Sequence, residues 1–157
     1  RLEKEARRLG LAIIETRRTD LNRPINAFDF PRFDRILLDA PCSGLGVLRR
    51  NPDAKWSFLK KDIAGFARRQ VRFLDRLAPL VKKGGALVFA VCSMEPEENE
   101  SVVMQFLKKH PNFAITADQA ITEKSVLSLL GADGFFRTAP HTHHMDGFFA
   151  ARLTRTC

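Results

Sequence analysis

The chain has 157 residues, 45% of them hydrophobic and 28% charged, which is ordinary for one globular domain with a buried core. Its net charge of +8, its sequence pI near 9.9 and its seven arginine or lysine doublets favour an acidic partner such as nucleic acid, although a solvated surface explains charge alone equally well. No apolar run reaches the roughly 20 residues of a membrane span. Three cysteines, an odd number, predict reduced thiols in the cytoplasm rather than a disulfide framework.

The first forty residues predict one helix followed by two strands. Residues 1–10 carry apolar side chains at helical spacing and end at Gly10, a typical helix C-cap. The apolar run at 11–15 predicts a short strand with a polar exit that ends at Asp20. The run at 34–40 predicts a second strand, and its unbroken apolar character is typical of parallel strands covered on both faces.

The middle of the chain predicts a helix, a strand and another helix. Residues 62–80 repeat apolar side chains at helical spacing and end before two adjacent glycines. Residues 86–91 form a third apolar run, and residues 98–110 predict a helix that ends before a proline. The strand, crossover helix and strand in this order predict a parallel pair.

The last part of the chain predicts antiparallel closure of the sheet. Residues 113–115 indicate a short strand, and the similar segments 133–137 and 146–150 indicate the two strands of a terminal hairpin. Strands alternating with helices, followed by a hairpin, predict an α/β sheet that is mostly parallel with an antiparallel edge.

Two cysteines follow predicted parallel strands at the point where each strand ends. Cys42 follows the run that closes with Asp39, and Cys92 follows the third run. If these strands pair directly, their ends lie about 4.8 Å apart, in the crevice where α/β sheets bind ligands. One such cysteine is usually a small buried hydrophobe, but two, each followed by serine, indicate a pair of thiols suited to covalent catalysis. Asp39 either binds a ligand there or caps the following turn.

These motifs together resemble the Sun (Fmu) family of RNA methyltransferases, which modify C5 of cytosine with S-adenosylmethionine. The resemblance covers residues 1–155 and is closest to the bacterial ribosomal-RNA branch, so it implies 16S ribosomal RNA as the partner. It also implies a Rossmann-like class I methyltransferase sheet. Four segments carry the resemblance: Asp39–Gly44, Arg49–Trp56, Cys92–Glu100 and Asp146–Leu153.

The resemblance implies roles for the residues at the predicted sheet edge. Cytosine C5 is a poor nucleophile until a thiolate adds to C6, and Cys92 is assigned that role, with Cys42 resolving the adduct. The proline–cysteine motif carries the nucleophile in the related DNA cytosine methyltransferases, which would favour Cys42, but the Sun pattern contains both motifs. Asp39 is expected to contact N4 or N3 of the base or the amino group of the cofactor, and Pro41 the cofactor. Asp20 is expected to contact the adenine end of S-adenosylmethionine.

The basic residues after the Cys42 motif are the expected RNA contacts. Arg49 and Arg50, together with Lys55, follow the cysteine loop directly, where a phosphate beside a flipped cytosine would pass. The alternative is that these are solvated charges with no ligand.

One element of the family pattern is missing from the sequence. The glycine-rich cofactor loop that follows the family's first strand is absent, and the glycines at 44 and 46 belong to the cysteine motif. We therefore expect residues 1–157 to form the carboxyl two-thirds of a catalytic domain that lacks its first strands.

Two readings from other classes compete with a methyltransferase. The first is a metal enzyme built on the histidines of segment 141–146, although a histidine-rich loop beside a hairpin is more often polar surface and no metal ligands are assigned. The second is a non-catalytic RNA-binding module that uses the arginine doublets with Trp56 for base stacking. Cys157, the third cysteine, is assigned no role.

Overall fold

The computed structural model describes residues 2–53, 56, 60–116 and 123–156. Its helices and strands follow one another in this order: α1 (Leu2–Arg8), β1 (Phe33–Asp39), α3 (Lys60–Leu77), β2 (Val81–Val91), α4 (Glu100–Lys109), β3 (Phe113–Ile115), α5 (Lys124–Leu127), β4 (Phe136–Thr138), α6 (Pro140–His143) and β5 (Phe148–Arg155). Three short 3-10 turns, η1 (Ala27–Asp29), η2 (Leu45–Val47) and η3 (Ala78–Leu80), lie between them. Among the residues described, no helix has the length and apolar character needed to cross a membrane.

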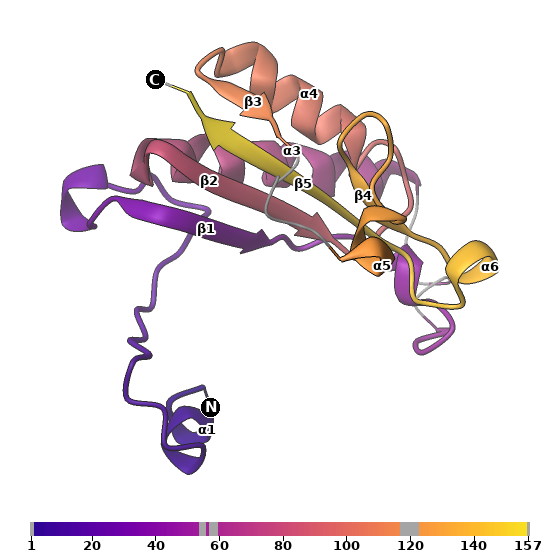
Figure 1. The fold of residues 1–157 in the computed structure, drawn as a ribbon, viewed down its shortest axis with the longest axis horizontal. Helices are drawn as coiled ribbons and strands as arrows, with labels where there is room; N and C mark the ends of the chain where they lie inside the picture. The colour runs from indigo at the N-terminus through magenta and orange to yellow at the C-terminus, as the bar shows by residue number, and fades with distance from the viewer. Residues whose placement is uncertain (1, 54–55, 57–59, 117–122, 157) are drawn as a thin grey trace.

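The strands form one sheet in the order β1-β2-β5-β3, with β4 also paired to β5 (Figure 1). β1 and β2 are parallel, whereas β5 is antiparallel to β2, β3 and β4. Four of the five described strands therefore run in one direction and β5 runs against them. The predicted mostly parallel α/β sheet and its antiparallel terminal hairpin are confirmed.

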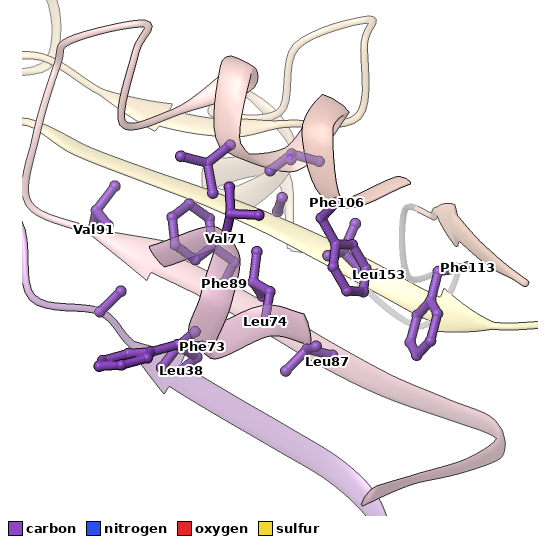
Figure 2. Close-up of a cluster of buried hydrophobic side chains, with 14 of the residues drawn as sticks. Leu38, Val71, Phe73, Leu74, Leu87, Phe89, Val91, Phe106, Phe113 and Leu153 are labelled. Carbon is purple, nitrogen blue, oxygen red and sulfur yellow. The ribbon is translucent and has the colours of Figure 1, made fainter. Parts of the chain in front are cut away.

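The core lies between the sheet and the two long helices, α3 and α4, which cover one of its faces (Figure 1). Alternate residues of β2 and β5 point into this core, because successive side chains of a strand face opposite ways. Figure 2 shows the helical side chains meeting them. Burying one such side chain contributes about 1.5–3 kcal/mol. The main members are Leu38, Val71, Phe73, Leu74, Leu87, Phe89, Val91, Phe106, Phe113 and Leu153.

The opposite face of β1 differs from the sequence prediction. Leu37 is 70% exposed although it stands in the unbroken apolar run that predicted cover on both faces. The described helices α3 and α4 pack on the face that carries Leu38 (Figure 2). The apolar run thus gives the strand correctly, but in this structure only one of its faces is buried.

The strand predicted at 11–15 is not formed, and residues 11–20 belong to no strand. Ile13 is 91% exposed in this segment, which links α1 to the sheet (Figure 1). An extended segment becomes a strand only when a neighbour supplies its hydrogen bonds, and the described residues offer this segment no such neighbour. The preceding helix α1 does form, and Gly10 has the left-handed φ of 67° expected after a helix.

The predicted parallel pair is formed by β1 and β2, but β2 is longer than the run at 86–91 that the sequence indicates. Gly84 and Gly85 do not separate the helix from the strand as expected, because β2 begins at Val81 and contains both glycines. Phe33 pairs with Val81 but Arg35 with Ala86, so extra residues of β2 bulge out between these two pairs. Gly84 has a φ of 74° in the bulge, which glycine adopts without strain.

Candidate active site

The two cysteine loops meet at the carboxyl ends of β1 and β2. Asp39 pairs with Ala90 in the parallel ladder, and the backbone N–H of Ala40 donates to the carbonyl of Ala90 at 3.0 Å. This register brings Sγ of Cys42 to 3.3 Å from Sγ of Cys92. Both cysteines are free and half-buried. The predicted meeting of two thiols at one sheet edge is therefore present in the structure.

The environment of Cys42 favours the protonated thiol. Burial, followed by the hydrogen bond with the Cys92 thiol, raises the pKa of Cys42 from its ordinary 9.0 to about 12. Cys42 therefore keeps its proton at neutral pH, and in its contact with Cys92 either sulfur can be the donor.

A buried carboxylate connects the two cysteine loops. Glu98 lies in the turn before α4 and is fully buried. It accepts the backbone N–H of Ser43 at 3.0 Å and the hydroxyl of Ser93 at 2.8 Å. The hydroxyl of Ser43 and the side-chain amide of Gln70 also donate to it, the latter at 3.0 Å. We call Ser43, Gln70, Ser93 and Glu98 the Glu98 cluster.

A close backbone contact joins the Cys42 loop to the turn before β5. The N–H of Gly46 donates to the carbonyl of Cys92 at 3.0 Å, and the N–H of Gly147 donates to the carbonyl of Gly46 at 2.8 Å. A Cβ atom on Gly46 would lie 2.0 Å from the carbonyl oxygen of Gly147. Only glycine allows this approach, so Gly46 holds the loop, the Cys92 backbone and the hairpin together.

The arginines expected to bind RNA are paired with an acidic residue of that same hairpin turn. Nε of Arg49 and Nε of Arg50 bind the two carboxylate oxygens of Asp146, the latter at 2.6 Å. Arg49 also donates to the carbonyl of His144 at 3.3 Å. The hydrogen bond from Arg49 and the nearby charges hold the pKa of Asp146 below its usual 3.8. The arginine side chains remain 46% and 68% exposed, so each guanidinium still presents donors to solvent.

Two further predicted residues lie at the same sheet edge. Asp39 ends β1 with an exposed side chain, and Pro41 is exposed in the loop between it and Cys42. The carbonyl of Pro41 accepts the amide of Gln70 at 3.0 Å, which ties this loop to α3. Lys55, the third expected RNA contact, lies outside the described residues, as does Cys157.

Asp20 is not brought to the thiols. Its neighbours Thr19 and Leu21 line a cavity of about 390 Å³ together with Phe33 and Leu77, at the start of β1 and the end of α3. The carboxylate of Asp20 accepts the backbone N–H of Asn22 at 2.9 Å, and this bond lowers the pKa of Asp20. In this structure Asp20 caps a local turn, because the strand expected to carry it to the sheet edge is not formed.

The histidine-rich segment does not assemble a metal site. The backbone N–H of Ala139 donates to Nδ1 of His143 at 3.0 Å, which closes the short helix α6. Within the described parts of the chain, no group of three or more His, Cys, Asp or Glu side chains is placed to hold a metal ion.

Comparison with known proteins places this arrangement in a family. Residues 1–154 match the model of the family described as 16S rRNA methyltransferase RsmB/F. The chain belongs to this family. Probable ribosomal RNA small subunit methyltransferase B of Bacillus subtilis is 39% identical over 156 residues, 98% of this chain and 34% of the relative. Its counterpart in Synechocystis is 42% identical, with 99% and 35% covered. The chain thus spans about a third of the length of these curated relatives.

Solved structures agree with the RsmB/F assignment. The chain matches NSun6 from Pyrococcus horikoshii, which was solved with the S-adenosylmethionine analogue SFG, at a TM-score of 0.80 and 28% identity. That match covers 99% of this chain and 38% of the other. A methyltransferase homologue from the same organism matches at a TM-score of 0.72 and 28% identity, covering 98% and 48%. The predicted Sun-family resemblance and the Rossmann-like fold class are confirmed.

Sequence reasoning on this RsmB/F family member missed the residues that hold the cysteine loops. Glu98 stands in a segment with three other glutamates, and nothing in the sequence tells which carboxylate is buried. A signal did exist for Gln70, since it lies on the apolar face of α3 between Ala67 and Leu74, where a polar side chain needs a buried partner. The serine after each cysteine was noticed, but its hydrogen-bond partner was not.

Proposed function

We propose that this chain is the cysteine-bearing part of a 16S ribosomal RNA (cytosine-5)-methyltransferase that uses S-adenosylmethionine. The observation that carries the proposal is the pair of thiols 3.3 Å apart at the carboxyl ends of two parallel strands. Family membership supports the RNA substrate and the methyl transfer. In this proposal residues 1–157 form the carboxyl two-thirds of a cytoplasmic catalytic domain.

In the proposed reaction the thiols act in sequence on one cytosine. The Cys92 thiolate adds to C6, the C5–C6 double bond opens, and its electron pair makes C5 nucleophilic. S-adenosylmethionine supplies the methyl group that C5 takes up. Loss of the C5 proton to a base then drives the Cys92 thiolate out and restores the double bond. Cys42 assists this release through its protonated thiol, which lies 3.3 Å from the departing Cys92 sulfur and can donate a hydrogen bond to it.

Residues at the sheet edge fit a cationic cofactor. The exposed carboxylate of Asp39 complements the ammonium group of S-adenosylmethionine or the amino group of cytosine, and Pro41 is exposed two residues further along the chain. We propose Asp20 for the adenine end, which requires residues 11–20 to gain a neighbouring strand in the longer protein. For RNA we propose Arg50 with Arg49, through the donors that Asp146 leaves exposed, and Lys55.

The test uses the longer protein that contains this chain, incubated with ribosomal RNA and S-adenosylmethionine. Cys92→Ala should abolish both methyl transfer and covalent adduct formation. Cys42→Ala should accumulate a protein–RNA adduct visible on a denaturing gel, because release is blocked. Cys157→Ser removes the third thiol as a matched control and should behave as the parent. An adduct formed by Cys92→Ala but not by Cys42→Ala would reverse the assignment.

Mapping by bisulfite sequencing tests the substrate. RNA from a strain that lacks the gene should lose one or more 5-methylcytosines in small-subunit ribosomal RNA, and reintroducing the gene should restore them. Reintroducing Cys92→Ala should not. An unchanged methylation map would contradict the proposed function.

A further inference from the structure

We propose that Glu98 is a positioning residue that sets the separation and orientation of the Cys42 and Cys92 thiols. It does so through Ser43 and Ser93, each of which directly follows one of the cysteines. The role in the reaction rests on the proposed function, whereas the geometric claim concerns only this chain.

The hydrogen bonds of the Glu98 cluster connect both loops to one point. Oε1 accepts the backbone N–H of Ser43 and the amide of Gln70, each at 3.0 Å. Oε2 accepts the hydroxyls of Ser43 and Ser93, and the two hydroxyls also lie 3.3 Å from each other. The Ser43 N–H also reaches Oε2 at the longer distance of 3.4 Å, so each carboxylate oxygen has at least two donors, which uses its full acceptor capacity. The loops after β1 and β2 are held by the same side chain.

Burial makes this arrangement stiff. Glu98, Ser93 and Gln70 are fully buried, and Ser43 is nearly so. In such surroundings a hydrogen bond is stronger than in water, and no solvent replaces one that is lost. The position just before α4 also suits a carboxylate, because the amino end of a helix carries partial positive charge. The cluster therefore resists any movement of one cysteine loop relative to the other.

A carboxylate is the group this site requires. The Ser43 N–H and the Gln70 amide can only donate here, so an amide in place of the carboxylate must turn its NH₂ group toward the Ser43 and Ser93 hydroxyls. Those hydroxyls then have to accept, and their own protons lose the acceptor that Glu98 supplies. Glu98→Gln keeps the size of the side chain and breaks that match. We expect the loops to shift as these hydrogen bonds rearrange, which changes the distance between the two sulfur atoms.

Oxidation by diamide measures that distance without the methylation reaction. The reagent accepts two electrons and two protons from the two thiols, a Cys42–Cys92 disulfide forms, and the product is detected in the intact mass. Glu98→Gln should slow this step about tenfold or more, since small displacements of reacting atoms have large effects on rate. Alkylation of each thiol by iodoacetamide, measured in parallel, corrects for changes in thiol reactivity.

Two further variants separate positioning from stability. Val103 lies in α4 and is fully buried. Val103→Ala removes core packing, so this variant should be less stable yet keep the parent's oxidation rate. Ser93→Ala removes one donor and should give an intermediate rate, which keeps the test available if Glu98→Gln does not fold. Parent-like oxidation in both Ser93→Ala and any folded Glu98→Gln, or equal slowing in Val103→Ala, would overturn the proposal.

Kinetics of the longer protein then connect the geometry to the reaction. Glu98→Gln should lower kcat with little change in KM for RNA, because the cluster is buried and two of its members directly follow the cysteines in the chain. A parent protein that shows no methyl transfer, combined with slowed oxidation in Glu98→Gln, would reject the proposed function and leave the positioning role intact. An unchanged kcat with slowed oxidation would reject the catalytic part of this inference.

Discussion

Two carboxylates hold the loop that follows β1, and they do so in opposite ways. Glu98 grips the loop from inside, is fully buried, and accepts hydrogen bonds from two hydroxyls, a backbone N–H and an amide. Asp146 holds it from the hairpin side, through two guanidinium groups that stay partly exposed. The first site has neutral donors and no contact with water, whereas in the second a carboxylate that is itself buried meets two cations that solvent still reaches.

This difference decides which site fixes the positions of other groups and which site has charges that salt and ligands can modulate. Exposed ion pairs contribute little to stability and weaken with salt, whereas a buried polar group that loses its partners costs its full desolvation. We therefore expect the Glu98 cluster to fix the thiols and the Asp146 pairs to tune how the arginines meet a ligand. The predictions below test this division, from the largest expected effect to the smallest.

Removing the two carboxylates should have unequal effects on folding. Glu98→Ala leaves several buried donors without an acceptor and should lower the free energy of unfolding by about 4 kcal/mol. Asp146→Ala should cost much less, because water solvates the released guanidinium groups. Chemical denaturation of both variants measures the two losses. Equal losses would contradict the distinction between the two sites.

The two regions meet at Gly46, where a side chain should disturb both. Gly46→Ala places a methyl group against the backbone of Gly147 and should lower stability by roughly 3 kcal/mol. Gly65→Ala is the matched control, since nothing lies within 4 Å of its Cβ position in α3. That change should instead stabilise the helix by about 0.5–1 kcal/mol. A tolerated Gly46→Ala would show that the loop is not held at this contact.

Periodicity and motifs predicted the parts of the molecule that depend on local sequence. The apolar runs predicted β1 and β2. Because these strands are parallel neighbours, their carboxyl ends lie side by side, and the two thiols that follow them come together. The prediction of a strand at 11–15 was wrong, because a strand also needs a neighbouring strand to pair with, and no local pattern reveals one. The role of Glu98 was missed for a similar reason, since burial of one glutamate depends on donors that are 5 to 55 residues away in the chain.

Alkaline pH should expose the burial of Cys42. Its pKa is raised from 9.0 to about 12, so the unfolded chain releases this proton first. The thiol therefore stabilises the fold fully below pH 9, and this contribution is lost as the pH rises from 9 towards 12. The chain has no tyrosine that would titrate in the same window. The free energy of unfolding of the parent should fall more steeply there than that of Cys42→Ala. Parallel pH profiles would show that Cys42 is not shifted.

The smallest expected effect concerns Arg50 and the salt dependence of RNA binding. Arg50 is 68% exposed, so one phosphate can bind it beside Asp146. Arg50→Ala should reduce the slope of log affinity against log salt by roughly 0.7, the value for one contact to a single strand. Asp146→Asn should raise affinity at low salt, because both guanidinium groups then lose a competing anion.

The control for that experiment is an arginine far from the thiols. Arg7 in α1 is 82% exposed and also pairs with a carboxylate, that of Glu3, so Arg7→Ala removes the same charge from a helix that lies apart from the sheet (Figure 1). Its salt slope should equal that of the parent. If Arg7→Ala and Arg50→Ala reduce the slope equally, RNA binding depends only on net charge, and the guanidinium groups paired with Asp146 have no specific role. A reduction confined to Arg50→Ala instead separates the two carboxylates by function. Asp146 then modulates how its paired arginines contact RNA, while the Glu98 cluster holds the thiols.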